Sequence, residues 1–119
     1  MVRAVRGSQR MNHDESILQS QIVQALSLHR IYAFMVPNDA AGKISQAKAG
    51  RLAAMGLRAG ASDLLVVLPG RVIFMEVKTP TGKQSKSQAI FQSVVEALGH
   101  QYALVRSVDE AMAAVKNNA

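Results

Sequence analysis

Two carboxylates and one ammonium group interrupt a pair of apolar runs in the stretch GASDLLVVLPGRVIFMEVKTP, residues 60–80. Asp63 opens the first run, and Glu76 and Lys78 lie near the end of the second. Converging carboxylates form a hard oxygen site that suits Mg²⁺ or Mn²⁺. A lysine beside such a site can orient a water molecule or stabilise charge on a phosphoryl oxygen. These groups together predict hydrolysis of a phosphodiester bond.

A hairpin would bring these groups together. The Pro-Gly pair between the runs predicts a tight turn that joins strands at 63–68 and 71–78. Side chains alternate along a strand, so Glu76 and Lys78 share one face. With the register set by the turn, Asp63 lies opposite Glu76 at the same end of the hairpin.

The alternative is an ordinary surface, in which Asp63 caps a turn while Glu76 and Lys78 form an exposed pair. Each residue taken alone fits that alternative well. The apolar residues around Glu76 on both faces of the strand argue against it. We therefore favour the metal site.

Two further polar residues could reach the site from the starts of helices. Glu15 lies on the apolar stripe of the first predicted helix, and Gln88 lies near the start of the third. Asn12 with Glu15, and Ser85 with Gln88, also have the spacing of N-terminal capping boxes. Both roles are compatible if the helix starts face the site, where they would also favour phosphate.

The rest of the pattern alternates between helical and strand periods. In chain order we predict a helix at 12–29, a strand at 31–36, a helix at 45–57, strands at 63–68 and 71–78, a helix at 85–99, a strand at 101–107 and a helix at 108–118. The order α-β-α-β-β-α-β-α contains one hairpin and one helical crossover. It predicts a mixed β-sheet flanked by helices, in the α/β to α+β range.

The same periods predict which helix faces are buried. The inward residues expected in the first helix are Leu18, Ile22, Ala25 and Leu26. Those expected in the helix at 85–99 are Ile90, Phe91, Val94, Val95 and Leu98.

The 119 residues fit one domain, which we place at 11–119, after an N-terminal extension at 1–10 that we expect to be disordered or a remnant of expression. The absence of cysteine excludes disulfides, thiolate metal sites and cysteine nucleophiles. No signal peptide is visible, and no apolar run approaches the roughly 18 residues of a spanning helix. We expect a soluble, cytoplasmic protein with no membrane partner. No phosphate-binding glycine motif occurs, so no nucleotide cofactor is expected.

The formal net charge is +6, and Arg3, Arg6 and Arg10 supply half of it. Between residues 16 and 62 the one acidic residue is Asp39, among five basic ones. This bias suits a polyanion such as DNA, although a basic surface without a partner fits the charge equally well. The candidate DNA contacts are Lys43, Lys48, Arg51, Arg58, Lys83 and Lys86.

A helix with Glu15, the G-x-x-D at 60–63, the E-V-K at 76–78 and the helix glutamine Gln88 together resemble the PD-(D/E)xK nuclease superfamily. The resemblance is strongest to its VRR-NUC (virus-type replication-repair nuclease) branch, and it covers nearly the whole chain from Met11. One departure is a serine at position 62, where the family usually has proline before the aspartate.

The resemblance implies a restriction-endonuclease-like core and a role for each matching residue. The implied ligands of Mg²⁺ or Mn²⁺ are Glu15, Asp63, Glu76 and the backbone carbonyl of Val77. Lys78 would be the catalytic lysine, and Gln88 would position substrate or water.

The resemblance also implies a substrate. Stand-alone members of this branch, usually bacterial or phage-encoded, are similar to homodimeric enzymes that act on branched DNA such as Holliday junctions during DNA repair. We therefore expect a homodimeric, metal-dependent DNA endonuclease. The alternatives are a flap or nonspecific nuclease of the same superfamily, a non-catalytic DNA-binding module with a vestigial site, and an unrelated α/β binding domain.

Overall fold

The computed structural model describes residues 13–37 and 45–117. In these ranges the elements follow the predicted order: α2 (His13–Leu28), β1 (Tyr32–Met35), α3 (Gln46–Ala54), β2 (Leu64–Leu68), β3 (Arg71–Val77), α4 (Lys86–Ala97), β4 (Gln101–Val105) and α5 (Val108–Lys116). The N-terminal extension, Asn12, Asp39 and Lys43 lie outside the described residues.

The strands form one four-stranded sheet in the order β1-β2-β3-β4. β1 pairs with β2 and β2 with β3 in antiparallel fashion, whereas β3 and β4 are parallel. The hairpin turn sets the predicted register, because Leu68 pairs with Arg71 and Leu64 pairs with Met75. The parallel pair requires a crossover, and α4 supplies it. The predicted mixed sheet is therefore confirmed.

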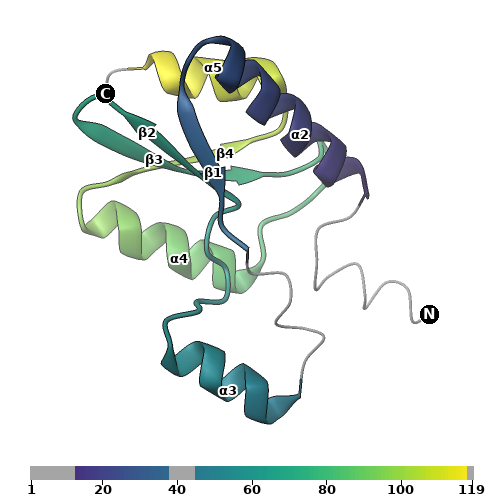
Figure 1. Ribbon diagram of the computed structural model, residues 1–119, viewed down its shortest axis with the longest axis vertical. Helices are drawn as coiled ribbons and strands as arrows, with labels where there is room; N and C mark the ends of the chain where they lie inside the picture. The colour runs from purple at the N-terminus through teal and green to yellow at the C-terminus, as the bar shows by residue number, and fades with distance from the viewer. Residues whose placement is uncertain (1–12, 38–44, 118–119) are drawn as a thin grey trace.

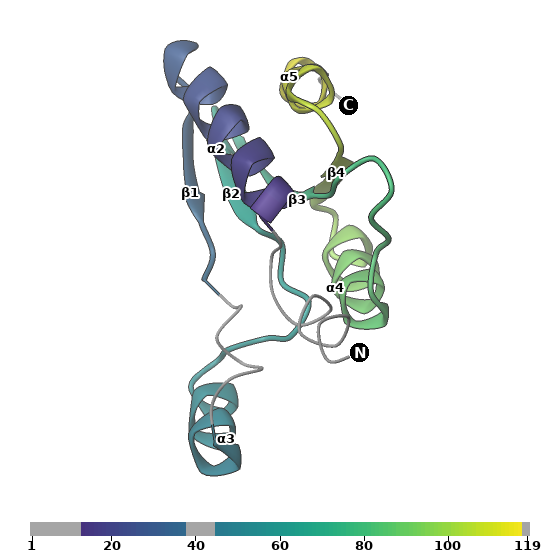
Figure 2. The ribbon, with the colours of Figure 1, turned by 90° about the vertical axis from the view of Figure 1, so that its right-hand side faces the viewer.

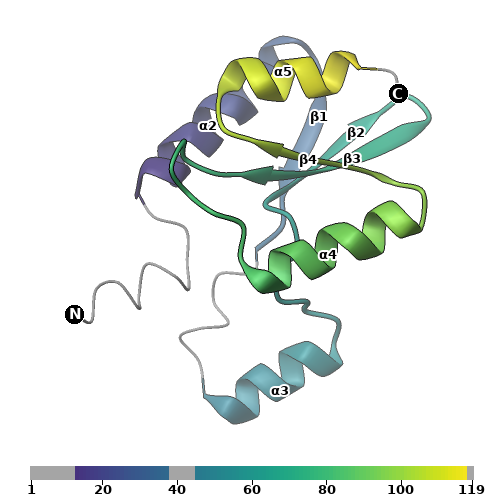
Figure 3. The ribbon, with the colours of Figure 1, turned by 180° about the vertical axis from the view of Figure 1, so that it is seen from behind.

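Helices cover both faces of the sheet (Figure 1). α2 and α5 pack against each other on one face, and α4 lies on the other, as the views from the side and from behind also show (Figures 2 and 3). The main core lies under α2 and α5, and its fully buried members include Ile22, Leu26, Leu64, Val66, Ile73, Met75, Val77 and Ala111. No helix in the described ranges is both long and apolar enough to cross a bilayer.

The predicted burial of α4 is wrong for three residues. Ile90, Val94 and Leu98 are 58%, 50% and 70% exposed. The helix meets the sheet through Phe91, whose ring lies 5.7 Å from that of Phe74, and it packs mainly on β4. Because α4 covers only the β3–β4 side of its face, one flank of the helix finds no sheet to pack against.

α3 stands apart from the layered body of the protein (Figure 2). Its start is capped, since the Ser45 hydroxyl accepts a hydrogen bond from the Lys48 amide at 3.1 Å. All of its residues are exposed or partly exposed. The helix thus presents its side chains, including Lys48 and Arg51, to the surroundings.

Candidate active site

Where the backbone pairing of β2 and β3 stops, the Asp63 side chain continues the hydrogen bonding between the two strands. The last backbone pair joins Leu64 to Met75. One residue further, the Asp63 carboxylate accepts a hydrogen bond from the Val77 amide at 2.7 Å, while the Asp63 carbonyl accepts one from Val36 at 2.9 Å. These bonds hold the Asp63 carboxylate at the end of the sheet, at the position that the hairpin register predicted.

Glu76 lies on the sheet face that α4 covers, because its neighbours Met75 and Val77 point into the core under α2 and α5. The side chain is only 1% exposed. Its Oε2 accepts a hydrogen bond from Gln88 Nε2 at 2.6 Å, whereas Oε1 is buried without a partner in the described part of the chain. An ordinary exposed surface pair is therefore wrong for Glu76.

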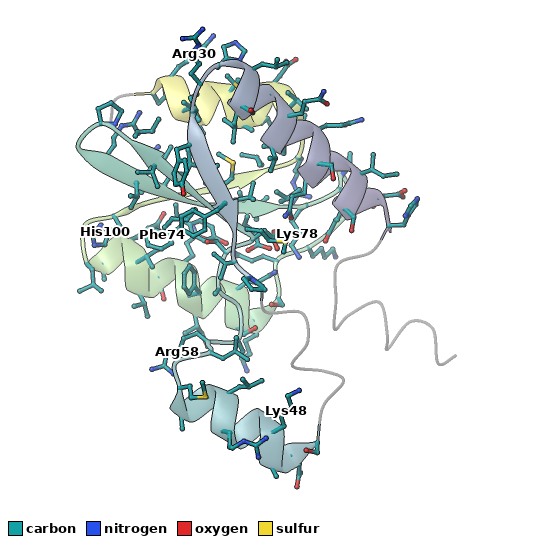
Figure 4. The ribbon with its side chains drawn as sticks, in the orientation of Figure 1. Arg30, Lys48, Arg58, Phe74, Lys78 and His100 are labelled. Carbon is teal, nitrogen blue, oxygen red and sulfur yellow. The ribbon has the colours of Figure 1, made fainter. Side chains whose placement is uncertain are left out.

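Lys78 continues the same strand and is only 9% exposed, which is unusual for a lysine. Figure 4 shows Lys78 between the start of α2 and the start of α4. Its ammonium group attracts the carboxylates of Glu76 and Glu15. Glu15 in turn reaches this end of the sheet from α2, close to Thr79 and Gly82.

The two carboxyl groups beside each other change the acidity of Glu76. Burial is the largest cause that raises the pKa of Glu76 to about 9, and the neighbouring Asp63 acts in the same direction. Lys78 acts against them. The pKa of Glu15 is also raised, again mainly by burial. The site therefore holds more acidic groups than it can ionise without a cation.

Gln88 forms the predicted capping box, and its side chain also reaches Glu76. Its backbone amide donates to the Ser85 hydroxyl at 3.1 Å, and its Oε1 accepts from the Ser85 amide at 2.8 Å, which completes a capping box. The side-chain Nε2 remains free to donate to Glu76. The oxygen of the Gln88 side-chain amide thus caps α4, while its nitrogen holds the Glu76 carboxyl group.

Gly60 explains how the Asp63 segment approaches α4 so closely. A Cβ added to Gly60 would overlap the backbone carbonyl group of Ser87 and lie 2.7 Å from the amide nitrogen of Gln88. The backbone of Gly60 also has φ +82°, a conformation that favours glycine. The glycine of the G-x-x-D pattern therefore lets the two site segments touch. Ser62, the departure from the family pattern, is buried and donates to the Leu64 carbonyl at 3.2 Å.

The basic candidates that the structure describes occupy exposed positions on and after α3 and near the start of α4. Lys48 and Arg51 belong to α3, Arg58 follows it, and Lys83 and Lys86 flank the start of α4. In Figure 4, Lys78 lies between α3 with Lys48 at one end of the molecule and Arg30 at the other. Lys43 lies outside the described residues.

The donor set fits a hard divalent cation. Asp63 and Glu76 offer carboxylate oxygens, and the unpartnered, buried Oε1 of Glu76 is the kind of atom that a cation would satisfy. In the ranges 13–37 and 45–117, no three acidic or histidine side chains converge closely enough to complete a metal site by themselves. The remaining ligands would have to come from backbone carbonyls, water or phosphate, as is usual for Mg²⁺.

The raised pKa of Glu76 predicts how stability depends on pH without metal. Between the ordinary pKa of 4.5 and about 9, folded Glu76 keeps a proton that the unfolded chain releases. The free energy of unfolding should therefore decrease as pH rises through this window, by up to about 1.4 kcal/mol per pH unit. Glu76→Gln mimics the protonated carboxyl, so that variant should lose less stability across the window. Urea unfolding of both proteins in EDTA from pH 5 to 9 checks this, and parallel curves would contradict it.

Two residues that support the site were missed from the sequence. Arg106 Nη1 donates to the carbonyls of Thr79 and Gly82, at 2.7 Å each, and so holds the loop that follows Lys78. Tyr102 lies close to Glu76 on the neighbouring strand, opposite Phe74. Neither role has a local signal, because the β3–β4 register is set across a long crossover.

Comparison with known proteins relates this arrangement to one fold. No protein-family model matches the sequence, and no curated protein matches it significantly. Among solved structures, one described as a "VRR_NUC domain" aligns with a TM-score of 0.64 and 20% identity, covering 88% of this chain and 97% of its own. Another, described as a "VRR_NUC domain protein", aligns with a TM-score of 0.68 and 16% identity, covering 86% of this chain and 84% of its own. The sequence resemblance is thereby confirmed at the level of structure: the chain has the fold of a VRR-NUC domain.

Proposed function

We propose that this chain is a divalent-metal-dependent DNA endonuclease that hydrolyses phosphodiester bonds in branched DNA as a homodimer. The observation that carries the proposal is the buried Glu76 carboxyl, with one oxygen held by Gln88 and the other without a partner in the described part of the chain. A second carboxylate and a largely buried lysine adjoin it. Burying several ionisable groups together costs stability, and proteins accept that cost mainly at functional sites.

In this proposal Asp63, Glu76 and the Val77 carbonyl hold Mg²⁺ or Mn²⁺, and Glu15 supports the site through its charge. The ion would supply positive charge against a phosphoryl oxygen and lower the pKa of a nearby water. Lys78 orients the attacking water or neutralises charge that develops on the phosphate. Gln88 holds Glu76 in place and lies at the start of α4, where backbone amides favour a phosphate. Hydrolysis would leave 5′-phosphate and 3′-hydroxyl ends.

The exposed basic residues support DNA as the substrate. Lys83 and Lys86 adjoin the start of α4, and Lys48, Arg51 and Arg58 extend the positive surface along α3. Such residues bind phosphates regardless of sequence, so binding should weaken steeply as salt increases. A basic helix that projects from the body of the protein suits a substrate that is wider than one duplex, such as a branch point.

The homodimer is supported by apolar surface that one chain leaves uncovered. Ile90, Val94 and Leu98 recur at a spacing of four residues along one flank of α4, and each is at least half exposed. Tyr32 and Phe34 of the edge strand β1 are exposed as well. Burial of such side chains drives stable association. We therefore place a second copy of the chain on this side of the protein, which would provide two sites for two strands.

The dimer makes a direct prediction. Val94→Glu should convert a dimer into a monomer, because a charge would have to be buried at the contact. Val94 is half exposed, so the variant should fold normally. Leu28→Glu is the matched control, since Leu28 is 76% exposed on the loop end of α2. Sedimentation equilibrium measures the masses, and a monomeric wild-type protein would contradict the dimer.

A comparison of DNA substrates distinguishes the proposed function from two alternative functions. A flap or nonspecific nuclease would cleave flap or linear duplex DNA as fast as a four-way junction, whereas a non-catalytic module would bind DNA and cleave none. We expect cleavage of the junction to be the fastest and to require Mg²⁺ or Mn²⁺. Equal cleavage rates on all three DNAs would show that the enzyme has no preference for branched DNA.

A further inference from the structure

Tyr102 lies in the middle of β4 with its side chain on the α4 side of the sheet. It pairs with Phe74 across the parallel ladder, and its ring lies 6.3 Å from that of Phe91. The residue is buried, so its hydroxyl must find partners within the protein. One partner is Gln84, and Glu76 lies close by on the same face of the sheet.

Gln84 belongs to a row of hydrogen-bonded side chains, and the donor and acceptor at each step follow from the bond between Gln92 and Glu96. Gln92 Nε2 donates to the Glu96 carboxylate at 3.2 Å, which leaves the Gln92 Oε1 as an acceptor. Gln84 Nε2 donates to that oxygen at 2.8 Å and to the Tyr102 hydroxyl at 3.3 Å. The hydroxyl oxygen is therefore used as an acceptor, and its own proton has to go to a different acceptor.

The acceptor that the structure offers is Glu76. Tyr102 pairs with Phe74, two residues before Glu76 on the same face of β3, and the two side chains of Tyr102 and Glu76 are close enough to interact. Gln88 on α4 thus donates to Glu76, and Tyr102 on β4 brings a second donor, its hydroxyl, close to it.

We propose that Tyr102 is a positioning residue, whose hydroxyl, oriented by Gln84, fixes the Glu76 carboxylate for a divalent cation. The inference rests on the proposed metal-dependent function, and it assigns a role to a residue outside the family pattern. Groups that orient a ligand in this way typically change metal affinity by 10-fold to 100-fold when they are removed. Without such support, the Glu76 side chain would lose conformational entropy when it binds the metal. This loss would lower its affinity for the metal.

The first test compares Tyr102→Phe with Tyr32→Phe. Both remove one hydroxyl, but Tyr32 is exposed on the edge strand, away from Glu76, and the substitution keeps the apolar ring that the proposed dimer would cover. We expect Tyr102→Phe to bind Mg²⁺ about 10-fold more weakly by titration calorimetry. In cleavage assays at a fixed, subsaturating Mg²⁺ concentration, kcat should fall while the KM for DNA stays the same. Tyr32→Phe should match the wild type in each measurement.

A spectroscopic signature reports on Tyr102 directly. The chain contains two tyrosines and no tryptophan. In Tyr32→Phe, all tyrosine emission comes from Tyr102, so Mg²⁺ should change that emission with a midpoint equal to the calorimetric Kd. In Tyr102→Phe, the remaining emission from Tyr32 should not respond. A purely structural tyrosine would give no such response.

The outcomes separate this inference from the proposed function. If the wild type binds Mg²⁺ and Tyr102→Phe binds it equally well, the positioning role is wrong and the nuclease proposal stands. If the wild type shows no response to Mg²⁺, both are overturned. Gln84→Met provides a second variant should Tyr102→Phe fold poorly. It keeps the tyrosine but frees its hydroxyl, so its Mg²⁺ affinity should fall in the same direction, and unchanged affinity would contradict the proposal.

Discussion

Replacing Glu76 with glutamine is expected to reduce DNA cleavage by at least about 10³-fold, because several kcal/mol of charge stabilisation by a metal would be lost. The amide keeps the shape of the side chain but cannot offer a charged ligand. Asp109→Asn is the control: it makes the same chemical change on an exposed residue at the start of α5 and should leave the rate unchanged.

The stability of Glu76→Gln distinguishes loss of chemistry from loss of structure. Because the wild-type carboxyl is buried next to Asp63, the metal-free variant should be the more stable protein near pH 8. A variant that is more stable and inactive identifies a residue whose charge serves the reaction. A variant that is inactive because it unfolds would leave the role of Glu76 without support.

The second large effect is expected at Gly60, where alanine should destabilise the protein by about 2–4 kcal/mol and lower cleavage as well. The added Cβ would overlap the Ser87 carbonyl group, and rigid backbone cannot move aside cheaply. The displacement would also separate Asp63 from the start of α4. Both effects follow from one methyl group at a position outside the reacting atoms.

Gly70→Ala is the matched control for this prediction. Gly70 has φ +74°, close to the +82° of Gly60, but a Cβ at Gly70 would meet nothing within 4 Å. The control therefore carries only the conformational cost, about 1 kcal/mol. Thermal unfolding of both variants measures the difference. Equal losses of stability would show that contact with α4 has no part in the effect.

Much of the fold follows from short-range patterns in the sequence. The Pro-Gly turn set the hairpin register, so the pairing of Leu68 with Arg71 could be predicted without the rest of the chain. The capping box of Ser85 and Gln88 was also visible, because it depends on residues three apart. Local patterns of this kind determine where elements begin, end and turn.

The remaining features depend on how elements meet in space. The helical period of α4 could not show that Ile90 and Val94 lie beyond the part of the sheet that the helix covers. Tyr102 reaches Glu76 only through the β3–β4 register, which a crossover of more than twenty residues determines. The family pattern includes Gly60 but does not explain why a glycine is needed there. The reason is its contact with α4, which comes much later in the chain.

The most direct test of the central claim is the rate at which the purified protein cleaves a synthetic four-way DNA junction in Mg²⁺, measured beside EDTA and beside Glu76→Gln. The account predicts cleavage by the wild type in Mg²⁺, none in EDTA, and a loss of at least about 10³-fold in the variant. Cleavage by Glu76→Gln at the wild-type rate, or no cleavage by the wild type with either Mg²⁺ or Mn²⁺, would contradict it.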